Sequence, residues 1–330
     1  MSIIPQKCRI DIKVFFTEVE KICDRLGLTE KMSPFLSYIQ KDTEDLFYTQ
    51  DQDDFELNEH AERMFFQCLL GEIQSNEIIT KYTSLDNLLR ICNDNEIAMV
   101  SILGMNDSTE CSYTDNYLKR KKRELPIRRA DQYYLGAYAF ITSFTLQHDN
   151  LTMWRLYGEN ARGISIDFKI KNDLKDNFFL APVSYAESNG RHTELDLLTE
   201  MQNIIVNNKR FKYWDLLVWR YFFKSFDYSI EKEIRLLYAP LTSISGVTWF
   251  KTDIDIVAPL AKFCIDDLSS ADKKNLHPIY PLQVCGITLG PQFGRTSDNE
   301  NIIPIMLRNK RSWTDIFVPV RPSTIDNYRS

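Results

Sequence analysis

The stretch that decides the fold is Tyr228-Ser-Ile-Glu231-Lys-Glu233-Ile-Arg235-Leu-Leu-Tyr238. It is typical of a loop that leads into a strand, with Glu231 and Glu233 spaced i, i+2 at its start. In an extended backbone this spacing places both carboxylates on one face, and Arg235 continues that face while the intervening apolar residues point the other way. Burying such charges is costly. The stretch therefore predicts a core strand that carries acid–base or electrostatic chemistry.

The rest of the chain separates into two parts. Residues 1–75 carry apolar residues at helical spacing, so we expect a helical N-terminal segment. Residues 76–330 alternate strand-like and helical patterns, and we expect them to form one α+β domain. Strands are predicted at 78–83, 97–103, 138–146, 162–168, 231–238, 247–251, 262–265, 284–289 and 316–320, and residues 195–226 are predicted to be mostly helical.

Composition excludes several classes of function. The net charge of −6 provides no global attraction to nucleic acid. The seven cysteines are dispersed without a C-x-x-C pair, which is typical of reduced thiols. No histidines have the spacing of a zinc site, charged residues precede any apolar run at the N-terminus, and no run is long enough to span a bilayer. We expect a cytoplasmic protein without a metal site or a membrane partner.

Two charged segments have more than one interpretation. Residues 42–62 contain nine acidic residues and no Lys or Arg. They predict a solvated loop and the flank of a helix, or an acidic surface through which the N-terminal segment binds an antitoxin or regulatory partner. Residues 119–129 are basic and predict a solvated helix or a contact to an RNA or DNA acceptor.

Three further motifs carry polar or aromatic side chains. Asn106, Asp107 and Glu110 follow a predicted strand and offer carboxylates, or they cap a helix. Ser143-Phe-Thr145 places two hydroxyls on one strand face. These hydroxyls could orient a carboxylate, and the alternative is an ordinary half-polar strand. Met153-Trp-Arg-Leu-Tyr157 predicts a short helix whose aromatic residues form a pocket wall or pack in the core.

Taken in order, these motifs resemble a widespread bacterial family of domains of unknown function. The resemblance covers about residues 78–290, and the matching motifs are Lys81-Tyr82-Thr83, Asn106/Asp107/Glu110, Ser143-Phe-Thr145, Met153-Trp154/Tyr157, Gly163-Ile-Ser-Ile166-Asp-Phe168 and Lys224-Ser225…Glu231-Lys-Glu233-Ile-Arg235. The family name carries no activity.

A weaker resemblance links the chain to ADP-ribosyltransferases of the Arg–Ser–Glu class. That class uses a basic residue on a first strand, a Ser-Thr-Ser-like strand and a Glu-x-Glu strand, in this chain order. Here the corresponding residues are Lys81 or Tyr82, Ser143-Phe-Thr145 and Glu231-Lys-Glu233. The chain departs from the pattern because Lys81 replaces the expected Arg and Phe replaces the middle Thr. The resemblance implies a mixed, split β-sheet core with NAD as co-substrate and a protein or nucleic acid as acceptor.

The same resemblance implies a role for each residue. Glu233 would stabilise the positive charge that develops on the ribose when the nicotinamide bond breaks. Glu231 would orient or deprotonate the acceptor, and Ser143 would hydrogen-bond Glu233. The residues expected to bind NAD are Lys81, Tyr82, Thr145, Tyr157 and Arg235, and the last of these has a structural ion pair as its alternative.

The sequence therefore predicts an NAD-dependent ADP-ribosyltransferase, a toxin-like effector of bacterial antiviral defence. One alternative is a Mg²⁺-dependent nuclease or phosphoesterase with Asp107, Glu110, Glu231 and Glu233 as oxygen ligands. The other is a non-catalytic interaction module whose acidic N-terminal segment binds a partner.

Overall fold

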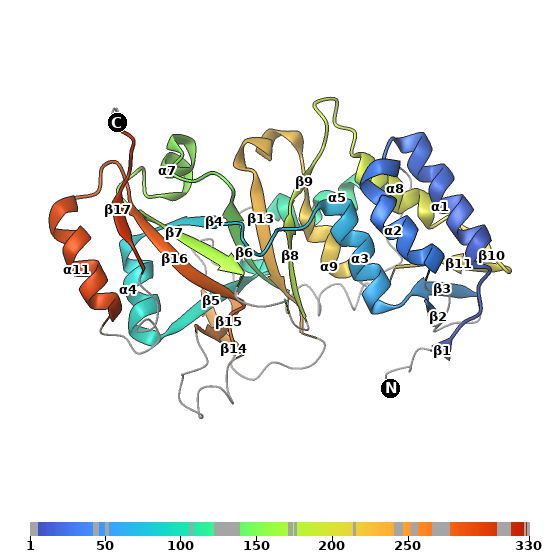
Figure 1. The fold of residues 1–330 in the computed structure, drawn as a ribbon, viewed down its shortest axis with the longest axis horizontal. Helices are drawn as coiled ribbons and strands as arrows, with labels where there is room; N and C mark the ends of the chain where they lie inside the picture. The colour runs from blue at the N-terminus through green and yellow to red at the C-terminus, as the bar shows by residue number, and fades with distance from the viewer. Residues whose placement is uncertain are drawn as a thin grey trace. The chain divides into compact units, whose positions relative to one another are not determined.

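The structure is a computed structural model, and it describes residues 6–41, 46–49, 53–105, 108–121, 139–170, 174, 177–213, 216–240, 247–251, 257–265, 278–308, 318–326 and 328. The chain forms two compact units (Figure 1). The first lies within Met1–Glu72, Asp107–Leu135 and Ala181–Ser229, and the second within Ile73–Asn106, Gly136–Leu180 and Ile230–Ser330. We expected a single boundary near residue 75. Instead, the N-terminal segment shares its unit with two later parts of the chain.

The N-terminal part of the first unit contains three helices, and capping residues mark the ends of the first of them. The helices are α1 (Ile12–Leu26), α2 (Thr29–Lys41) and α3 (Glu59–Leu70). The Asp11 side chain accepts hydrogen bonds from the first turn of α1, and Gly27 ends this helix with a φ of 72°. Phe15 and Val19 are fully buried, which confirms the helical spacing expected here. α1 packs on α2 and on α8 (Thr193–Met201), and α2 packs on α3.

A small sheet completes this core. Its order is β1 (Gln6–Lys7), β2 (Phe47–Thr49), β3 (Asp54–Leu57), β11 (Lys209–Phe211) and β10 (Ile205–Val206). The Phe15 ring lies 5.2 Å from both Phe47 and Phe211, centroid to centroid, so residues from distant parts of the sequence share one aromatic cluster. The acidic segment 42–62 contains β2, β3 and the start of α3, and its Glu62 is buried. Part of this segment lies outside the described residues.

The helix expected over residues 195–226 is wrong for most of its length. α8 ends at Met201, and β10 and β11 then form a hairpin whose two turn residues, Asn207 and Asn208, have φ of 52° and 63°. Asn tolerates this left-handed conformation, which two-residue hairpins require. The segment continues through α9 (Leu216–Trp219), η2 (Arg220–Phe222) and β12 (Phe223–Lys224), which pairs with β9 (Ser184–Tyr185).

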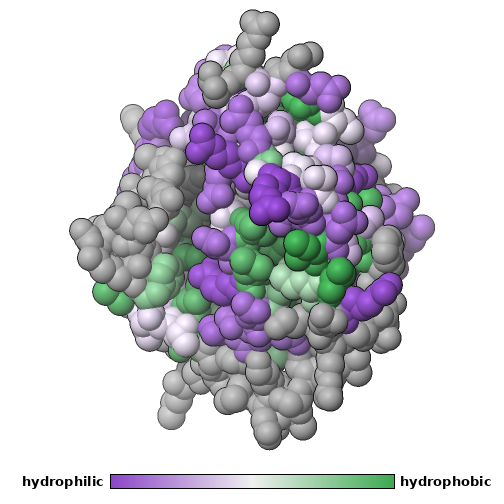
Figure 2. Space-filling view, turned by 90° about the vertical axis from the view of Figure 1, so that its left-hand side faces the viewer, coloured by the Kyte–Doolittle hydropathy of each residue, from purple (hydrophilic) through white to green (hydrophobic). Residues whose placement is uncertain are grey.

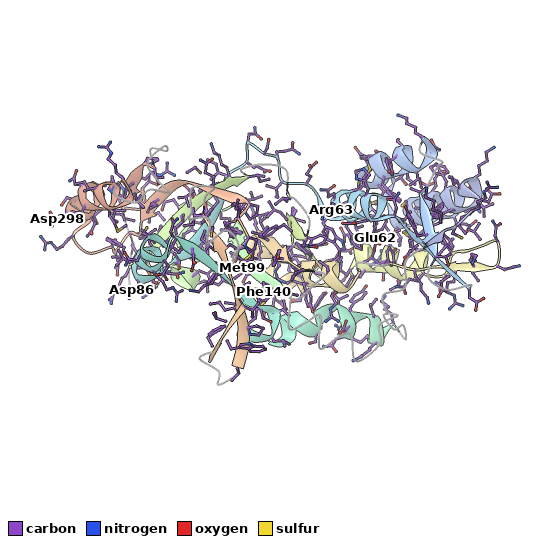
Figure 3. The ribbon with its side chains drawn as sticks, turned by 90° about the horizontal axis from the view of Figure 1, so that it is seen from below. Glu62, Arg63, Asp86, Met99, Phe140 and Asp298 are labelled. Atoms are coloured by element: carbon purple, nitrogen blue, oxygen red, sulfur yellow. The ribbon has the colours of Figure 1, made fainter. Side chains whose placement is uncertain are left out.

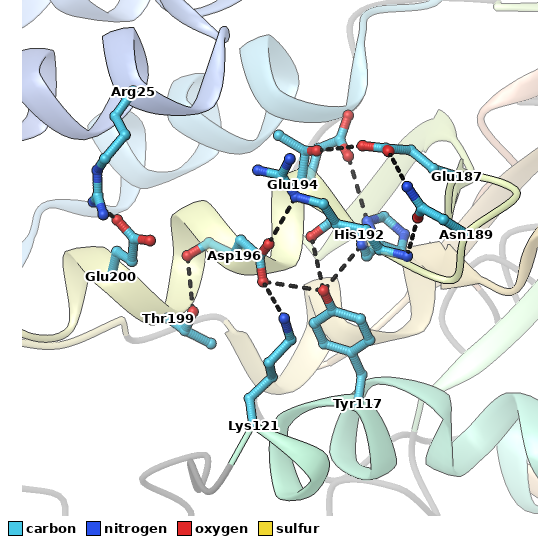
Figure 4. A network of polar contacts seen from close by, with 12 residues as sticks. Arg25, Tyr117, Lys121, Glu187, Asn189, His192, Glu194, Asp196, Thr199 and Glu200 are labelled. Carbon is cyan, nitrogen blue, oxygen red and sulfur yellow. Dashed lines mark hydrogen bonds and ion pairs between the residues drawn. The ribbon is translucent and has the colours of Figure 1, made fainter.

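A polar network joins α8 to α5 (Ser108–Arg120) within the first unit (Figure 4). The Tyr117 hydroxyl donates to Asp196 at 3.0 Å and accepts from the backbone N–H of His192 at 3.0 Å. Lys31 of α2 donates to Glu194 at 2.7 Å. Burial acts to raise the pKa of Glu194, but hydrogen bonds and charge from His192 and Lys31 lower it to about 2.

The second unit is built on a ten-stranded sheet. Its main path runs β14-β15-β5-β6-β4-β7-β16-β17, and β13 pairs with β6 and with β8. The strands are β4 (Ile79–Thr83), β5 (Glu96–Ser101), β6 (Phe140–Thr145), β7 (Ile164–Ile170), β8 (Phe178–Pro182), β13 (Glu233–Tyr238), β14 (Val247–Lys251), β15 (Val257–Cys264), β16 (Leu282–Leu289) and β17 (Val320–Pro322). The helices are α4 (Leu85–Asp94), α7 (Leu151–Tyr157) and α11 (Thr296–Arg308), with the single turn η1 (Ile102–Gly104) after β5. The mixture of helices and sheets confirms the α+β class.

The sheet divides at β6. All six residues of β6 pair with β13 along one edge. On the other edge, β5 pairs with Phe140 and Ile141 at one end, and β4 pairs with Thr145 at the opposite end. Because a strand has only two edges, β4 and β5 share the second edge and diverge from each other between these points.

One face of this sheet is the apolar core. Met99 of β5 and Phe140 of β6 are fully buried in it (Figure 3), together with Phe144, Ile234 and Leu236. The apolar positions of the deciding stretch therefore point into the core, as expected from their alternation. The opposite face carries the polar residues that form the candidate site.

The outer surface of the second unit also exposes apolar side chains. Ile302 and Ile305 of α11 are 58% and 61% exposed. Figure 2 shows the face on the α11 side of Figure 1, where apolar side chains gather near the centre among hydrophilic ones. Across the part of the chain that the structure describes, no helix combines the length and the apolar character needed to cross a membrane.

Candidate functional site

The strand of the deciding stretch begins at Glu233, two residues later than expected. The preceding residues form a 3-10 segment, η3 (Phe226–Glu231), and Lys232 then has a φ of 44°. A left-handed residue breaks the two-residue alternation of an extended chain. The expectation that Glu231 and Glu233 share a strand face is therefore wrong, because Glu231 lies in the turn before the strand.

Glu233 and Arg235 form a buried ion pair on one face of β13. The Arg235 Nε atom donates to Glu233 Oε1 at 2.7 Å, and Arg235 Nη2 donates to Oε2 at 3.2 Å. Glu233 is 5% exposed and Arg235 is fully buried. Two parallel hydrogen bonds hold the carboxylate in one orientation. Arg235 therefore makes the structural ion pair that was its alternative role.

The hydroxyl across from Glu233 belongs to Thr145. In the register of β13 and β6, Thr145 stands opposite Glu233, and Ser143 stands opposite Arg235. Directly opposed residues have Cβ atoms about 5 Å apart, whereas diagonal neighbours are about 7–8 Å apart. Ser143, which we expected to hydrogen-bond Glu233, is thus its diagonal neighbour.

Thr145 and Tyr157 connect Glu231 to this strand face. The Thr145 Oγ1 atom donates to the backbone oxygen of Glu231 at 2.6 Å and accepts from the N–H of Gln147 at 3.0 Å. The Tyr157 hydroxyl donates to Glu231 Oε1 at 2.5 Å. Tyr157 is 50% exposed and Glu231 only 8%. The pair therefore presents an aromatic ring and a carboxylate beside Glu233.

The sheet separates Lys81 from these residues. Thr80 of β4 stands opposite Thr145, so it shares the face of Glu233, and its neighbour Lys81 points to the other side. The half-buried Lys81 ammonium lies 5.9 Å from the centroid of the Phe144 ring. Burial lowers the pKa of Lys81 to about 8, although the charge of Glu233 acts to raise it.

Tyr82 lies on the face of Glu233 but is engaged in packing. Its ring contacts the Trp154 ring edge-on, with centroids 4.7 Å apart. Its hydroxyl donates to the backbone oxygen of Gln147 at 2.8 Å and accepts from the N–H of Asn150 at 2.9 Å. Burial raises the pKa of Tyr82 to about 12, although the Asn150 hydrogen bond acts to lower it. These contacts hold α7 against the sheet.

A second polar cluster lies on the same face, and sequence analysis did not single it out. Thr80 donates to Asp167 Oδ1 at 2.7 Å and contacts His148 Nδ1 at 2.5 Å, and Arg321 Nη2 donates to Asp167 Oδ2 at 3.2 Å. Burial acts to raise the pKa of Asp167, but the His148 and Thr80 hydrogen bonds and the charges of His148 and Arg321 lower it overall. The signal in the sequence was an acid that alternates with apolar residues in the strand Ile164–Ile170.

Asp107, a ligand in the nuclease alternative, lies outside the described residues, as do its neighbour Asn106 and the side chain of Glu110. Within the described ranges, no group of three or more His, Cys, Asp or Glu side chains is arranged to hold a metal ion. The structure describes the basic segment 119–129 only up to Lys121, which is the residue directly after α5.

One segment of the chain is similar to a protein family of unknown function. Residues 153–236 match the family model DUF2971, described as a protein of unknown function. The match begins in α7 and ends in β13, so it includes Tyr157, Asp167, Glu231 and Glu233. No curated protein and no solved structure matches the chain.

Proposed function

We propose that this protein is an NAD-dependent ADP-ribosyltransferase that transfers ADP-ribose to a macromolecular acceptor, a protein or a nucleic acid. The observation that carries the proposal is the buried, bidentate pair of Glu233 and Arg235 at the start of a central strand. The division of the sheet at β6, beside this pair, also supports it. The setting of a toxin-like effector in bacterial defence rests on the resemblance alone.

In this proposal Glu233 stabilises the transition state. Breaking the bond between nicotinamide and ribose develops positive charge on the ribose. A carboxylate that is already oriented in a water-poor site stabilises such charge more than a mobile, solvated one. Arg235 supplies that orientation through its two hydrogen bonds.

The neighbouring residues then bind and orient the two substrates. The exposed ring of Tyr157 stacks on the nicotinamide, and Glu231, held by the Tyr157 hydroxyl, orients the acceptor. Thr145 and Ser143 offer hydroxyls to the ribose from the adjacent strand. Lys81 is the cation for the NAD phosphates, and it would have to reach them through the division of the sheet beside β6.

The test is an assay with NAD labelled in its adenylate part. Wild-type protein is incubated with the NAD and a bacterial lysate, and transferred label and released nicotinamide are measured. We expect Glu233→Gln, which keeps the shape and removes the charge, to lower the rate about 100-fold or more. Glu187→Gln, which alters an exposed acid of the first unit, is the matched control and should leave the rate unchanged.

The outcomes separate the alternatives. Absence of transfer, of nicotinamide release and of NAD binding by the wild type would contradict the proposal. Cleavage of nucleic acid that disappears with a chelator would favour the Mg²⁺-dependent nuclease. A cellular phenotype that survives Glu233→Gln would favour a non-catalytic interaction module.

A further inference from the structure

A single polar row crosses the sheet face that carries Glu233. Paired residues on successive strands give the order Glu233, Thr145, Thr80, Asp167 and Gly286. Directly paired residues point to the same face, so the side chains of this row stand on one side of the sheet. The two carboxylates of the row are three strands apart, and the His148 ring is placed above the row through its contact with Thr80.

The hydrogen bonds determine which nitrogen of His148 carries a proton. A threonine hydroxyl has one proton to donate. Thr80 donates that proton to Asp167, whose lowered pKa keeps it ionised and able only to accept. In its second contact, Thr80 Oγ1 must therefore accept a hydrogen bond from His148. The Nδ1 atom of His148 thus carries the proton, and its Nε2 atom has a lone pair.

This lone pair faces outward. The His148 side chain is 42% exposed, and no partner for Nε2 is found among the residues that the structure describes. Asp167, by contrast, is 7% exposed and lies behind the imidazole, with its Oδ1 atom 3.6 Å from Nδ1. A buried carboxylate behind an imidazole stabilises the positive charge that appears when Nε2 takes up a proton.

The loop that carries His148 is held on both sides. The backbone N–H of Gln147 donates to Thr145 at 3.0 Å, and its backbone oxygen accepts from Tyr82 at 2.8 Å. Asp149 accepts hydrogen bonds at 2.7–2.8 Å from the Ser323 hydroxyl, the Thr324 hydroxyl and N–H, and the Trp154 indole. An imidazole fixed by its neighbours in this way is oriented before any substrate binds.

We propose that His148 is a catalytic general base whose Nε2 atom accepts the proton of the attacking acceptor group, and that Thr80 and Asp167 are its positioning residues. This inference rests on the proposed transferase function. It assigns to His148 the proton transfer that the sequence had given to Glu231. Glu231 then orients the acceptor through its contact with Tyr157.

The step balances as follows. A hydroxyl or amine of the acceptor attacks the anomeric carbon of the ribose, and its proton passes to His148 Nε2. The bond between that carbon and the nicotinamide nitrogen breaks, and its electron pair leaves with nicotinamide. The imidazolium, stabilised by Thr80 and Asp167, then releases its proton to water. No further reactant is needed.

Glu233 and the residue beneath His148 stand two strands apart along the row. Neighbouring strands lie about 4.8 Å apart, so Thr80 and the imidazole above it stand ~10 Å from Glu233. Glycosidases that use a carboxylate on one side of the sugar and a base on the other place the two groups about 6.5–9.5 Å apart.

The other ionisable groups around His148 belong to three elements and the loop itself. Arg321 of β17 donates to Asp167 and to Thr288, and the Cys285 thiol lies at an irregularity in β16 beside Asp167. Burial and the charge of Asp167 raise the pKa of Cys285. Asp149 has a lowered pKa because its four hydrogen bonds outweigh burial, so it stays ionised over the same range as Asp167.

The test compares variants by rate, by pH profile and by NMR. We expect His148→Gln to lower the transfer rate about 100-fold and to remove the acid limb of the wild-type profile, because glutamine cannot accept the proton. Asp167→Asn keeps an oxygen for Thr80 but removes the charge behind the imidazole, so it should lower kcat while leaving the KM for NAD near the wild-type value. His60→Gln, an exposed histidine of the first unit, is the matched control and should match wild type.

The nitrogen NMR spectrum of the imidazole provides a readout without turnover. We expect the Nδ1–H tautomer for His148 in the wild type and in Thr80→Ser, and a mixture of tautomers in Thr80→Val. An Nε2–H tautomer in the wild type would overturn the inference, as would a His148→Gln variant with the wild-type rate and profile. Lack of NAD turnover by the wild type would instead overturn the proposed function, and the role of His148 would fall with it.

Discussion

Glu233 and Arg235 show how a buried charge is tolerated in this core. The pair is almost completely shielded from water, and the two groups are hydrogen-bonded to each other. Removing one member of a buried ion pair leaves the other uncompensated, and this costs about 3–5 kcal/mol, whereas replacing both by neutral groups costs much less. The stability of the strand therefore depends on keeping or losing both charges together.

The buried ion pair predicts a non-additive pair of substitutions. Arg235→Met should lower the free energy of unfolding by about 3–5 kcal/mol, and the double variant Glu233→Gln/Arg235→Met should recover most of that loss. Urea unfolding of the two single variants, the double variant and wild type measures this. Arg295→Met, which removes an exposed ion pair with Asp298, is the control and should change stability little. Equal losses for Arg235→Met and the double variant would contradict the prediction.

Lys81 is a second residue whose charge is unfavourable in the folded state. Its pKa is about 8 in the fold, below the ordinary 10.5, mainly because of burial. A basic group with a lowered pKa disfavours folding when it is charged, so this cost is absent above pH 10.5 and fully present below pH 8.

We therefore predict that Lys81→Met is more stable than wild type below pH 8, and that the difference shrinks as the pH rises toward 10.5. The difference in the free energy of unfolding is set by the pKa shift of Lys81, at about 1.4 kcal/mol for each unit of that shift. Denaturant unfolding at several pH values between 7 and 10 measures the difference. A constant difference across that range would show that the charge of Lys81 is not responsible.

At the scale of the element, the entry to β13 decides which acids act together. Local alternation predicts that Glu231 and Glu233 share a face, but the turn at Lys232 places Glu231 in η3. The alternation rule assumes a continuous strand, and the position of a strand's first residue depends on its pairing partner. Here Glu233 is the first residue to pair with β6.

The connection between α7 and β7 gives another prediction at this scale. Gly163 lies where the backbones of two segments approach, and a Cβ atom at this position would overlap the carbonyl oxygen of Thr83. Gly163→Ala should destabilise the protein by about 1–3 kcal/mol, because backbone atoms must shift. Gly294→Ala, with no atom within 4 Å of the added Cβ, is the matched control. Thermal unfolding of both variants measures the contrast, and equal melting temperatures would contradict the prediction.

At the scale of the whole molecule, each unit is assembled from three separate parts of the chain. From the sequence we expected a contiguous helical segment followed by a contiguous α+β domain. Local sequence patterns contain information only about residues that are close together in the chain. The aromatic cluster of Phe15, Phe47, Phe55 and Phe211 shows why the expectation is incomplete, since its last member comes from the hairpin after α8. No pattern among neighbouring residues indicates the contact of Phe211 with Phe15 and Phe55.

The division into units predicts the behaviour of fragments. Residues 1–75 should fail to fold alone, and residues 76–330 should fail to fold the first unit, because each fragment lacks part of the core of that unit. Far-UV circular dichroism and size-exclusion chromatography of the two fragments, separately and co-expressed, measure this, and co-expression should restore a folded complex. A fragment 1–75 with the helical signal of a folded domain would contradict the prediction.

The sequence by itself determined most of the local structure. It predicted the amphipathic helices α1 and α3, the strands β4, β6, β7, β13, β14 and β16, and the α+β class, because hydrophobic periodicity and caps are local properties. It also selected Glu233 and Thr145, which the structure places directly opposite each other. Only the tertiary structure decided that Glu231 lies before the strand, that Lys81 faces away from Glu233, and that His148 and Asp167 stand in the same polar row. Pairing register and strand order bring distant residues together, and no short stretch of sequence contains that information.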